Sequence, residues 1–233
     1  MPNNLGNFMI FSYSRLSLYE TCPFRFYLKY ILGSPEPVTK PLALGKAVHK
    51  AIELKINGMS ENEAILAAII ETDFHPEVTY EEVLKLLQQA PDVKGRTEIH
   101  FKLPLDSSSG IQLQGYIDLL QDVHFWDWKS NWKPYRVHDT RQLALYAWAI
   151  MKMRGIRQVK GTLFFLRFRK AESFIYNESD GNEAREWAIQ LAEQIEMKKS
   201  CLESFPDMAS SLFQPTPGSH CKHCPFVLEC IKK

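Results

Sequence analysis

The stretch GYIDLLQDVHFWDWKS, residues 115–130, is typical of two β-strands joined by a short polar turn. Asp118 ends the first expected strand, and Asp127 and Lys129 stand two positions apart on the second. Because side chains alternate between the two faces of a strand, Asp127 and Lys129 point the same way while Trp128 points to the opposite face, into the core. If the strands pair as a hairpin, Asp118 lies beside Asp127.

Two neighbouring carboxylates repel each other, and a hard divalent cation with oxygen ligands relieves that repulsion. The hairpin therefore predicts a site for magnesium or manganese, in which Lys129 supplies a fixed positive charge for a phosphate group. The alternative is a surface hairpin with scattered charges, since Asp-x-Lys alone is common by chance. An unpaired charge among strand residues is costly, which favours the functional interpretation.

Outward from this hairpin, the hydrophobic period predicts an α/β protein with a sheet in its middle third. Expected strands cover residues 95–105, 110–120, 123–129, 159–168 and 173–177, and expected helices cover 42–56, 141–155 and 182–202. Capping boxes are expected at Ser17, Ser60 and Thr79, each with a glutamate three residues later. We expect one domain over residues 1–233, made of an N-terminal helical segment (1–92), a catalytic sheet core (93–178) and a C-terminal helix with a tail (179–233).

Composition sets limits on partners and location. A hydrophobic content of 45% and a charged content of 24% are ordinary for a globular protein of 233 residues. No apolar run is long enough to cross a membrane, and the N-terminus lacks the pattern of a signal peptide, so a cytoplasmic protein without membrane contact is expected. Because the net charge is only +1, nucleic-acid binding requires a local basic patch.

Such a patch follows the second strand in KSNWKPYR, residues 129–136. Positive charge tracks a nucleic-acid backbone, and aromatic faces stack on unpaired bases without reading sequence. The residues expected to bind DNA here are Trp132, Lys133, Tyr135 and Arg136, with the run RFRK at 167–170 as a further contributor. The alternative for both stretches is a solvated loop with ordinary charges.

The tail HCKHCPFVLEC, residues 220–230, gathers three cysteines and two histidines. Cysteine thiolates are soft ligands that bind zinc or iron–sulfur clusters. Five cysteines in a reducing compartment favour a metal over disulfides. Spacing alone leaves the metal open, and the candidates for a fourth ligand are Cys22, Cys201, His220 and His223.

Two weaker features complete the pattern. Gln142 and Tyr146 are four residues apart and share one helix face, and His49 lies on an earlier helix with Gly45 four residues before it. Each has an ordinary explanation in packing when taken alone. Together with the hairpin and the tail, they occur in the order SYSRLSLYETCPFRFYLKYILG, GKAVHKAIE, TEIHFKLPL, GYIDLL, FWDWKSNW, RQLALYAWAI and CKHCPFVLEC.

This series of motifs resembles the PD-(D/E)XK nuclease superfamily, in its RecB/AddB-type branch with an iron–sulfur cluster, over nearly the whole chain. CRISPR-associated nucleases with four cysteines share the plan and are the nearest competing branch. The resemblance implies a restriction-endonuclease-like core, in which a mixed central sheet is flanked by helices, with a helical cap joined by the cluster. The one departure is Trp128, where the family commonly has a smaller residue.

The resemblance also implies roles for individual residues. Asp118 and Asp127 match the metal-binding carboxylates, Lys129 matches the catalytic lysine, and His49 matches a histidine that helps hold the metal. Gln142 and Tyr146 match the Q-x-x-x-Y motif beside the active site and the DNA, and Glu98 fits a frequent acidic position that joins the metal ligands. The cysteines that match the 4Fe-4S ligands are Cys22, Cys221, Cys224 and Cys230, which leaves Cys201 as a spare thiol.

The expected activity is therefore metal-dependent hydrolysis of DNA by an exonuclease that acts on single strands or ends, in DNA repair or CRISPR adaptation. Its expected partners are DNA and either a helicase or CRISPR integration proteins. The alternative is a catalytically silent or partner-dependent DNA-binding module of a helicase–nuclease or CRISPR adaptation complex. The expected cofactors are a structural 4Fe-4S cluster and Mg²⁺ or Mn²⁺.

Overall fold

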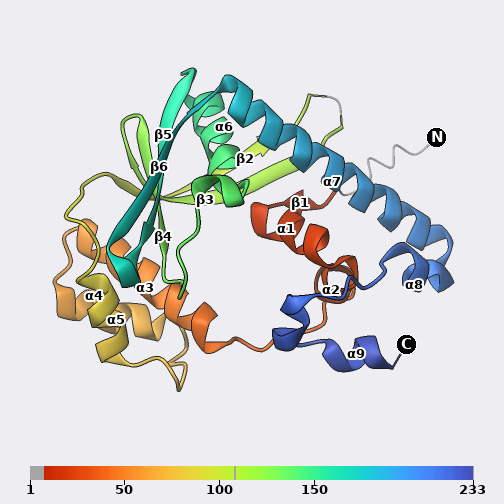
Figure 1. The fold of residues 1–233 in the computed structure, drawn as a ribbon, viewed down its shortest axis with the longest axis horizontal. Helices are drawn as coiled ribbons and strands as arrows, with labels where there is room; N and C mark the ends of the chain where they lie inside the picture. The colour runs from red at the N-terminus through yellow and green to blue at the C-terminus, as the bar shows by residue number, and fades with distance from the viewer. Residues whose placement is uncertain (1–7, 108, 233) are drawn as a thin grey trace. The chain divides into compact units, whose positions relative to one another are not determined.

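The structure is a computed structural model that describes residues 8–107 and 109–232. The chain divides into two compact units (Figure 1). The central unit comprises Val38–Phe101 and Tyr116–Ala184, and the terminal unit comprises the described residues before Val38, then Lys102–Gly115, then those from Arg185 onward. Neither unit coincides with one of the three expected segments, and the single nuclease domain stays a prediction. Residues 1–7, which belong to the stretch that lacks a signal-peptide pattern, lie outside the described residues.

A mixed sheet of six strands forms the framework, in the order β1-β3-β4-β5-β6 with β2 paired to β3. The strands are β1 (Ile10–Phe11), β2 (Arg96–Pro104), β3 (Gln112–Gln121), β4 (His124–Lys129), β5 (Gln158–Phe165) and β6 (Lys170–Asn177). β1 pairs with β3 and β4 with β5 in parallel, whereas β3 pairs with β4 and β5 with β6 in antiparallel fashion. This mixed sheet with flanking helices confirms the predicted α/β fold class.

The helices occupy the connections and the two ends of the chain. They are α1 (Tyr13–Thr21), α2 (Pro23–Phe26), a π-helical turn (Tyr27–Ile31), α3 (Lys40–Ile56), α4 (Glu61–Ile70), α5 (Tyr80–Leu87), α6 (Gln142–Arg154), α7 (Glu178–Ser204), α8 (Ala209–Leu212) and α9 (Val227–Ile231). Short 3-10 turns cover Val137–Asp139, Leu166–Phe168, Pro206–Met208 and Ser219–His223. None of the helices within the described ranges is long and apolar enough to cross a membrane.

Side-chain caps explain several of these helix boundaries. Ser60 and Thr79 accept hydrogen bonds from the backbone N–H groups of Glu63 and Glu82, at 3.4 and 3.2 Å, which confirms the Ser/Thr half of two of the three expected capping boxes. The third is wrong, because α1 starts one turn earlier than its sequence suggests. Ser12 caps that helix by accepting from Arg15 N–H at 3.3 Å, and Ser17 lies inside it.

The core of the central unit lies between the sheet and helices α3, α4 and α5. Trp128 of β4 and Phe164 of β5 belong to this core, together with Val48 and Ile52 of α3 and Leu87 of α5. Trp128 is only 2% exposed, as the alternation of β4 predicts. The opposite face of the same strands carries Asp127 and Lys129 toward α6, which positions polar side chains against a helix.

Candidate metal and catalytic site

The β3–β4 hairpin brings the two predicted carboxylates together. Leu119 pairs with Trp126 in the antiparallel register, so the next step along the ladder sets Asp118 opposite Asp127. The backbone N–H of Trp128 donates to Asp118 Oδ2 at 2.7 Å and fixes that side chain. Asp127 is only 4% exposed, so its charge is held largely out of water.

Lys129 neutralises part of that charge. Its Nζ forms an ion pair with Asp127 Oδ2 at 2.6 Å and donates to Gln142 Oε1 at 2.9 Å. Burial disfavours the charged ammonium, but the Asp127 carboxylate outweighs burial and raises the pKa of Lys129 above its ordinary value. Lys129 therefore remains a cation at neutral pH.

Gln142, the first residue of α6, joins the two charged groups. Its Nε2 donates to Asp127 Oδ1 at 3.0 Å, while its Oε1 accepts from Lys129. Because a donor and an acceptor on one amide meet two different partners, the orientation of the side chain is fixed in this network. One helical turn further, Tyr146 packs edge-to-face on Phe101, with ring centroids 5.5 Å apart. Burial and the charge of Asp127 raise the pKa of Tyr146, so its phenol stays protonated.

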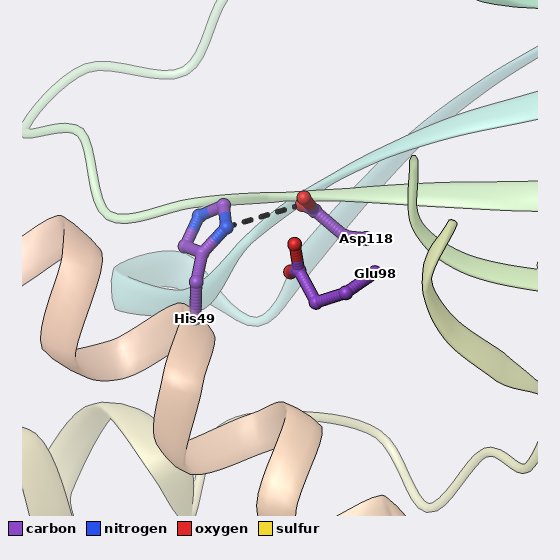
Figure 2. A group of neighbouring side chains, drawn as sticks. All are labelled: His49, Glu98 and Asp118. Atoms are coloured by element: carbon purple, nitrogen blue, oxygen red, sulfur yellow. Dashed lines mark ion pairs between the residues drawn. The ribbon is translucent and has the colours of Figure 1, made fainter. Parts of the chain in front are cut away.

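Beside this network, His49, Glu98 and Asp118 form a second cluster (Figure 2). One ligand atom from each residue lies within 4.8 Å of the others, and His49 Nδ1 is 3.3 Å from Asp118 Oδ2. Figure 2 shows the imidazole of α3 and the two carboxylates of neighbouring strands pointing toward one another. Three separate elements therefore contribute to one potential metal site.

The protonation of this cluster reflects crowding of charge. Burial disfavours the imidazolium of His49, yet the adjacent Asp118 carboxylate outweighs it and raises the pKa of His49 to about 9. Burial, followed by the charge of Asp118, raises the pKa of Glu98 to about 7. The His49 imidazolium holds the pKa of Asp118 below its ordinary value despite burial.

The backbone at Glu98 is unusual for a strand. Its φ is +48°, in the left-handed region that only glycine adopts at little cost. Such strain persists where the surrounding structure imposes it and is concentrated at functional sites. The sequence pattern of a regular strand gives no signal of this feature.

The donor set fits a hard divalent cation. The two carboxylates of Glu98 and Asp118 and the imidazole of His49 supply oxygen and nitrogen ligands, as magnesium and manganese prefer. The buried Asp127 Oδ2 lies 2.6 Å from Lys129 Nζ, so a cation that binds this oxygen would share it with the ammonium. Asp127 stands outside the group of three whose ligand atoms lie within 4.8 Å, and it is tied to Lys129 and Gln142 instead.

The family model of the PD-(D/E)XK nuclease superfamily matches residues 10–230, which is nearly the whole chain. The chain belongs to the PD-(D/E)XK nuclease superfamily. Membership makes it a metal-dependent nuclease with DNA as its substrate class. The match is to the superfamily as a whole, so the RecB/AddB-type branch stays a prediction.

Other comparisons add little to this assignment. No curated protein is similar enough in sequence to be counted as a relative. Among solved structures, the one described as "Crystal structure of SSO0001" is 14% identical, with 91% of this chain and 95% of that chain covered and a TM-score of 0.39. The superfamily assignment rests on the family model alone.

In this PD-(D/E)XK chain, the predicted DNA-binding loop leaves the sheet directly after Lys129. Trp132, Lys133 and Arg136 are exposed, whereas Tyr135 turns inward and packs edge-to-face on Phe165 at 5.2 Å. Arg136 is also tied to Asp139, through its backbone N–H at 2.8 Å and its guanidinium at 3.2 Å. Three of the four residues predicted to bind DNA are therefore exposed, and the fourth, Tyr135, packs against the sheet.

Arg167, from the basic run at 167–170, reaches this loop. Its guanidinium lies 3.7 Å from the centre of the Trp132 ring, and its Nε donates to the carbonyl of Ser130 at 2.8 Å. The parallel pairing of Lys129 with Phe165 brings the two segments together. No local pattern reveals that pairing, because the segments are separated by all of α6.

The predicted iron–sulfur cysteines lie in the terminal unit. Cys22 is buried with Phe24, Leu28 and Phe226, and Cys224 and Cys230 pack against the same apolar cluster. Cys221 accepts a hydrogen bond from the backbone N–H of Gly218 at 3.4 Å, while Cys201 lies on α7. In the described part of the chain, no three cysteine sulfur atoms lie within 4.8 Å of one another.

Proposed function

We propose that this nuclease is a DNA exonuclease that acts on single strands or on DNA ends, with the site between β3, β4, α3 and α6 as its active site. The observation that carries the proposal is the contact between two clusters. The Asp127–Lys129–Gln142 network adjoins the His49–Glu98–Asp118 group through the paired carboxylates of the hairpin. Hydrolysis of a phosphodiester needs negative ligands that hold a cation and a positive group that neutralises charge on the phosphate. The two clusters supply both kinds of charge side by side.

The residues that would hold a divalent cation are His49, Glu98, Asp118 and Asp127. When bound there, Mg²⁺ or Mn²⁺ supplies Lewis acidity and a water molecule of lowered pKa. His49 must be neutral to act as a ligand, so its proton leaves when the ion binds. Trp128 N–H holds Asp118 in place through its 2.7 Å hydrogen bond.

Lys129 and Gln142 serve the phosphate side of the reaction. The ammonium of Lys129 neutralises charge that develops on the phosphate oxygens or orients the attacking water. Gln142 keeps Lys129 and Asp127 in register, because it bonds to both. Tyr146, held in its protonated form, has a hydroxyl available to donate a hydrogen bond to the substrate backbone.

The direct test follows degradation of end-labelled linear single strands, linear duplexes and circular DNA by anaerobically purified protein with manganese or magnesium. We expect degradation of linear DNA that requires the metal and spares circles. Lys129→Ala should lower kcat about 100- to 1,000-fold, as loss of a charge-stabilising group does elsewhere. Lys152→Ala removes an exposed lysine near the end of α6 and serves as the matched control.

Equal rates for Lys129→Ala and wild type would reject the proposed site. Rapid cleavage of circular DNA would reject the exonuclease and leave an endonuclease at the same residues. Binding of DNA without cleavage by metal-loaded protein would favour a DNA-holding module that serves a helicase or a CRISPR integration complex.

We also propose that Cys22, Cys221, Cys224 and Cys230 bind a structural 4Fe-4S cluster. Supporting this, residues from both ends of the chain share one apolar cluster, and the Cys221 sulfur accepts a backbone N–H. The thiolates of one zinc ion would lie roughly 3.8 Å apart, given Zn–S bonds of about 2.3 Å in a tetrahedron. In a four-iron cluster each thiolate binds a different iron, so wider spacing is compatible with it.

Iron, sulfide and zinc analysis of anaerobically purified protein distinguishes these metals. A brown protein with about four iron atoms and four sulfides per chain supports the cluster. Stoichiometric zinc without sulfide would replace it by a structural zinc site.

A further inference from the structure

Trp132 is the most unusual side chain near the proposed active site because it is 73% exposed. Trp128 and Trp148, by contrast, are buried. One face of the Trp132 indole is covered by the guanidinium of Arg167, and no other described ring stacks on it. Its second face is therefore available to a planar partner.

Arg167 is held in this position from two sides. Its Nε donates to the Ser130 carbonyl, and its carbon centre lies 3.7 Å from the indole centroid, within the range of a strong cation–π contact. The 3-10 turn Leu166–Phe168 directly follows β5, whose last residue pairs with Lys129. The indole and the guanidinium thus form a pre-ordered pair, which we call the Trp132–Arg167 platform.

Trp132 of the platform lies three residues after Lys129, on the loop that follows β4. Tyr135 of the same loop packs edge-to-face on Phe165 of β5. This inward aromatic packs against the sheet, whereas Trp132 is exposed and contacts Arg167 on one face. Of the two aromatic residues in the loop, only Trp132 is presented to a ligand.

We infer that the Trp132–Arg167 platform stacks an unpaired base of the DNA strand whose phosphate lies at Lys129, so that the preferred substrate is single-stranded. This deepens the proposed function and rests on it for the position of the strand. A base in the interior of a duplex is already stacked on both faces and offers no face to the indole. Stacking of this kind is worth about 1–3 kcal/mol per base and is tolerant of sequence.

The test separates binding from cleavage by using Lys129→Ala as the host protein. Fluorescence anisotropy measures its affinity for a short oligothymidine, for the same strand with abasic sites, and for a blunt duplex. Adding Trp132→Ala should weaken binding of oligothymidine about 5- to 150-fold, which is 1–3 kcal/mol expressed as a ratio. The abasic strand should bind weakly, because its bases are missing. The substitution should change that affinity little, because the remaining contacts are to the charged backbone.

Matched variants locate the effect. Trp132→Phe keeps a stacking face and should retain most of the affinity. Phe74→Ala removes another strongly exposed aromatic of the central unit, 67% exposed, and should change nothing. Arg167→Ala should weaken oligothymidine binding as well, because the indole loses its fixed partner.

Equal affinities of the host and its Trp132→Ala derivative for oligothymidine would overturn the inference. An equal loss for the abasic strand would also overturn it, because the role would then be electrostatic or structural. If wild type fails to cleave DNA but oligothymidine binding still depends on Trp132, the proposed function fails and the platform stands. If wild type cleaves and Trp132 has no effect, the reverse holds.

Discussion

His49 and Glu98 hold protons that a metal ion must displace. The pKa of His49 is raised to about 9 by the neighbouring carboxylate of Asp118, against the effect of burial. The pKa of Glu98 is raised to about 7 by burial and by the same carboxylate. Near neutral pH and without a cation, His49 is therefore largely protonated and Glu98 is about half protonated, and binding of a cation releases protons.

From these values we predict opposite pH dependences for the metal-free and metal-loaded proteins. Each folded-state pKa lies above its ordinary value, so each group stabilises the metal-free protein at low pH. That contribution is lost as pH rises, from about 4.5 to 7 for Glu98 and from about 6.5 to 9 for His49. Metal affinity rises over the same window, so manganese should raise Tm more at alkaline pH.

Thermal denaturation across this window, with and without manganese, measures both trends. About 1 kcal/mol corresponds to a Tm shift of roughly 2–4 °C in a protein of this size. His49→Ala should flatten the upper part of the metal-free curve. Parallel curves for the two forms would contradict the assignment of His49 and Glu98 as ligands.

Single residues were predictable where a local period fixes their direction. The two-residue period of a strand places Asp127 and Lys129 on one face and Trp128 on the other. The helical period places Gln142 and Tyr146 on the same face of one helix. Arg167 was not predictable as a partner of Trp132, because their contact depends on the pairing of β4 with β5. The roles of these residues in catalysis stay predictions until they are tested.

Strand β2 has an irregular backbone conformation at Glu98. Its residue Glu98 has a positive φ, which costs about 1–2 kcal/mol for an L-residue other than glycine. The strand therefore carries strain at the residue that contributes a carboxylate to the metal group. A glycine at this position would relieve the strain but remove the ligand.

We predict that Glu98→Gly and Glu98→Ala both weaken manganese binding but differ in stability. The glycine variant should be more stable than the alanine variant by about 1 kcal/mol when metal is absent, because only alanine retains the unfavourable φ. Urea denaturation gives the stability difference, and calorimetric titration with manganese gives the affinity. Equal stability of the two variants would show that the strand relaxes around alanine.

Element boundaries were predictable only where a capping signal was unique. Ser60 and Thr79 each precede a glutamate at the right spacing and cap α4 and α5. Before and within α1 the chain offers Ser12, Ser14 and Ser17, and it uses Ser12. Propensity cannot choose among them, because serine is a good cap at any of these positions and each would start the helix at a different residue.

At the scale of the whole molecule, the proposed cluster joins residues from both ends of the chain. Cys22 and the group from Cys221 to Cys230 are about 200 residues apart in sequence. A crosslink over so long a loop restricts the unfolded chain, by an amount worth about 5 kcal/mol in the chain-entropy model. The terminal unit, which contains all four cysteines, should depend on it most.

We predict that Cys22→Ser lowers iron content and Tm together, because it removes a cluster ligand. Cys201→Ser should leave both the iron content and Tm unchanged, since Cys201 lies on α7, outside the apolar cluster that Cys22, Cys224 and Cys230 share. Absorbance in the visible range and thermal denaturation under anaerobic conditions measure the two effects. A stable Cys22→Ser protein with full iron content would exclude Cys22 as a ligand.

The assembly of segments into units was beyond local sequence patterns. The terminal unit takes its residues from three separate parts of the chain, and the last of them includes most of the long helix α7. The strands and helices of the sheet core were predictable, because each has a strong hydrophobic period of its own. Which distant segments share a core depends on packing that no single window contains.

The β4–α6–β5 crossover has a consequence for how this activity can be inherited. Asp127 and Lys129 lie on its first strand, and Gln142 and Tyr146 lie on its helix, so one uninterrupted stretch encodes the whole network that surrounds Lys129. Recombination that exchanges this stretch between related genes transfers the network as a block. His49 and Glu98 are encoded upstream of this stretch, so such an exchange leaves these two proposed metal ligands unchanged.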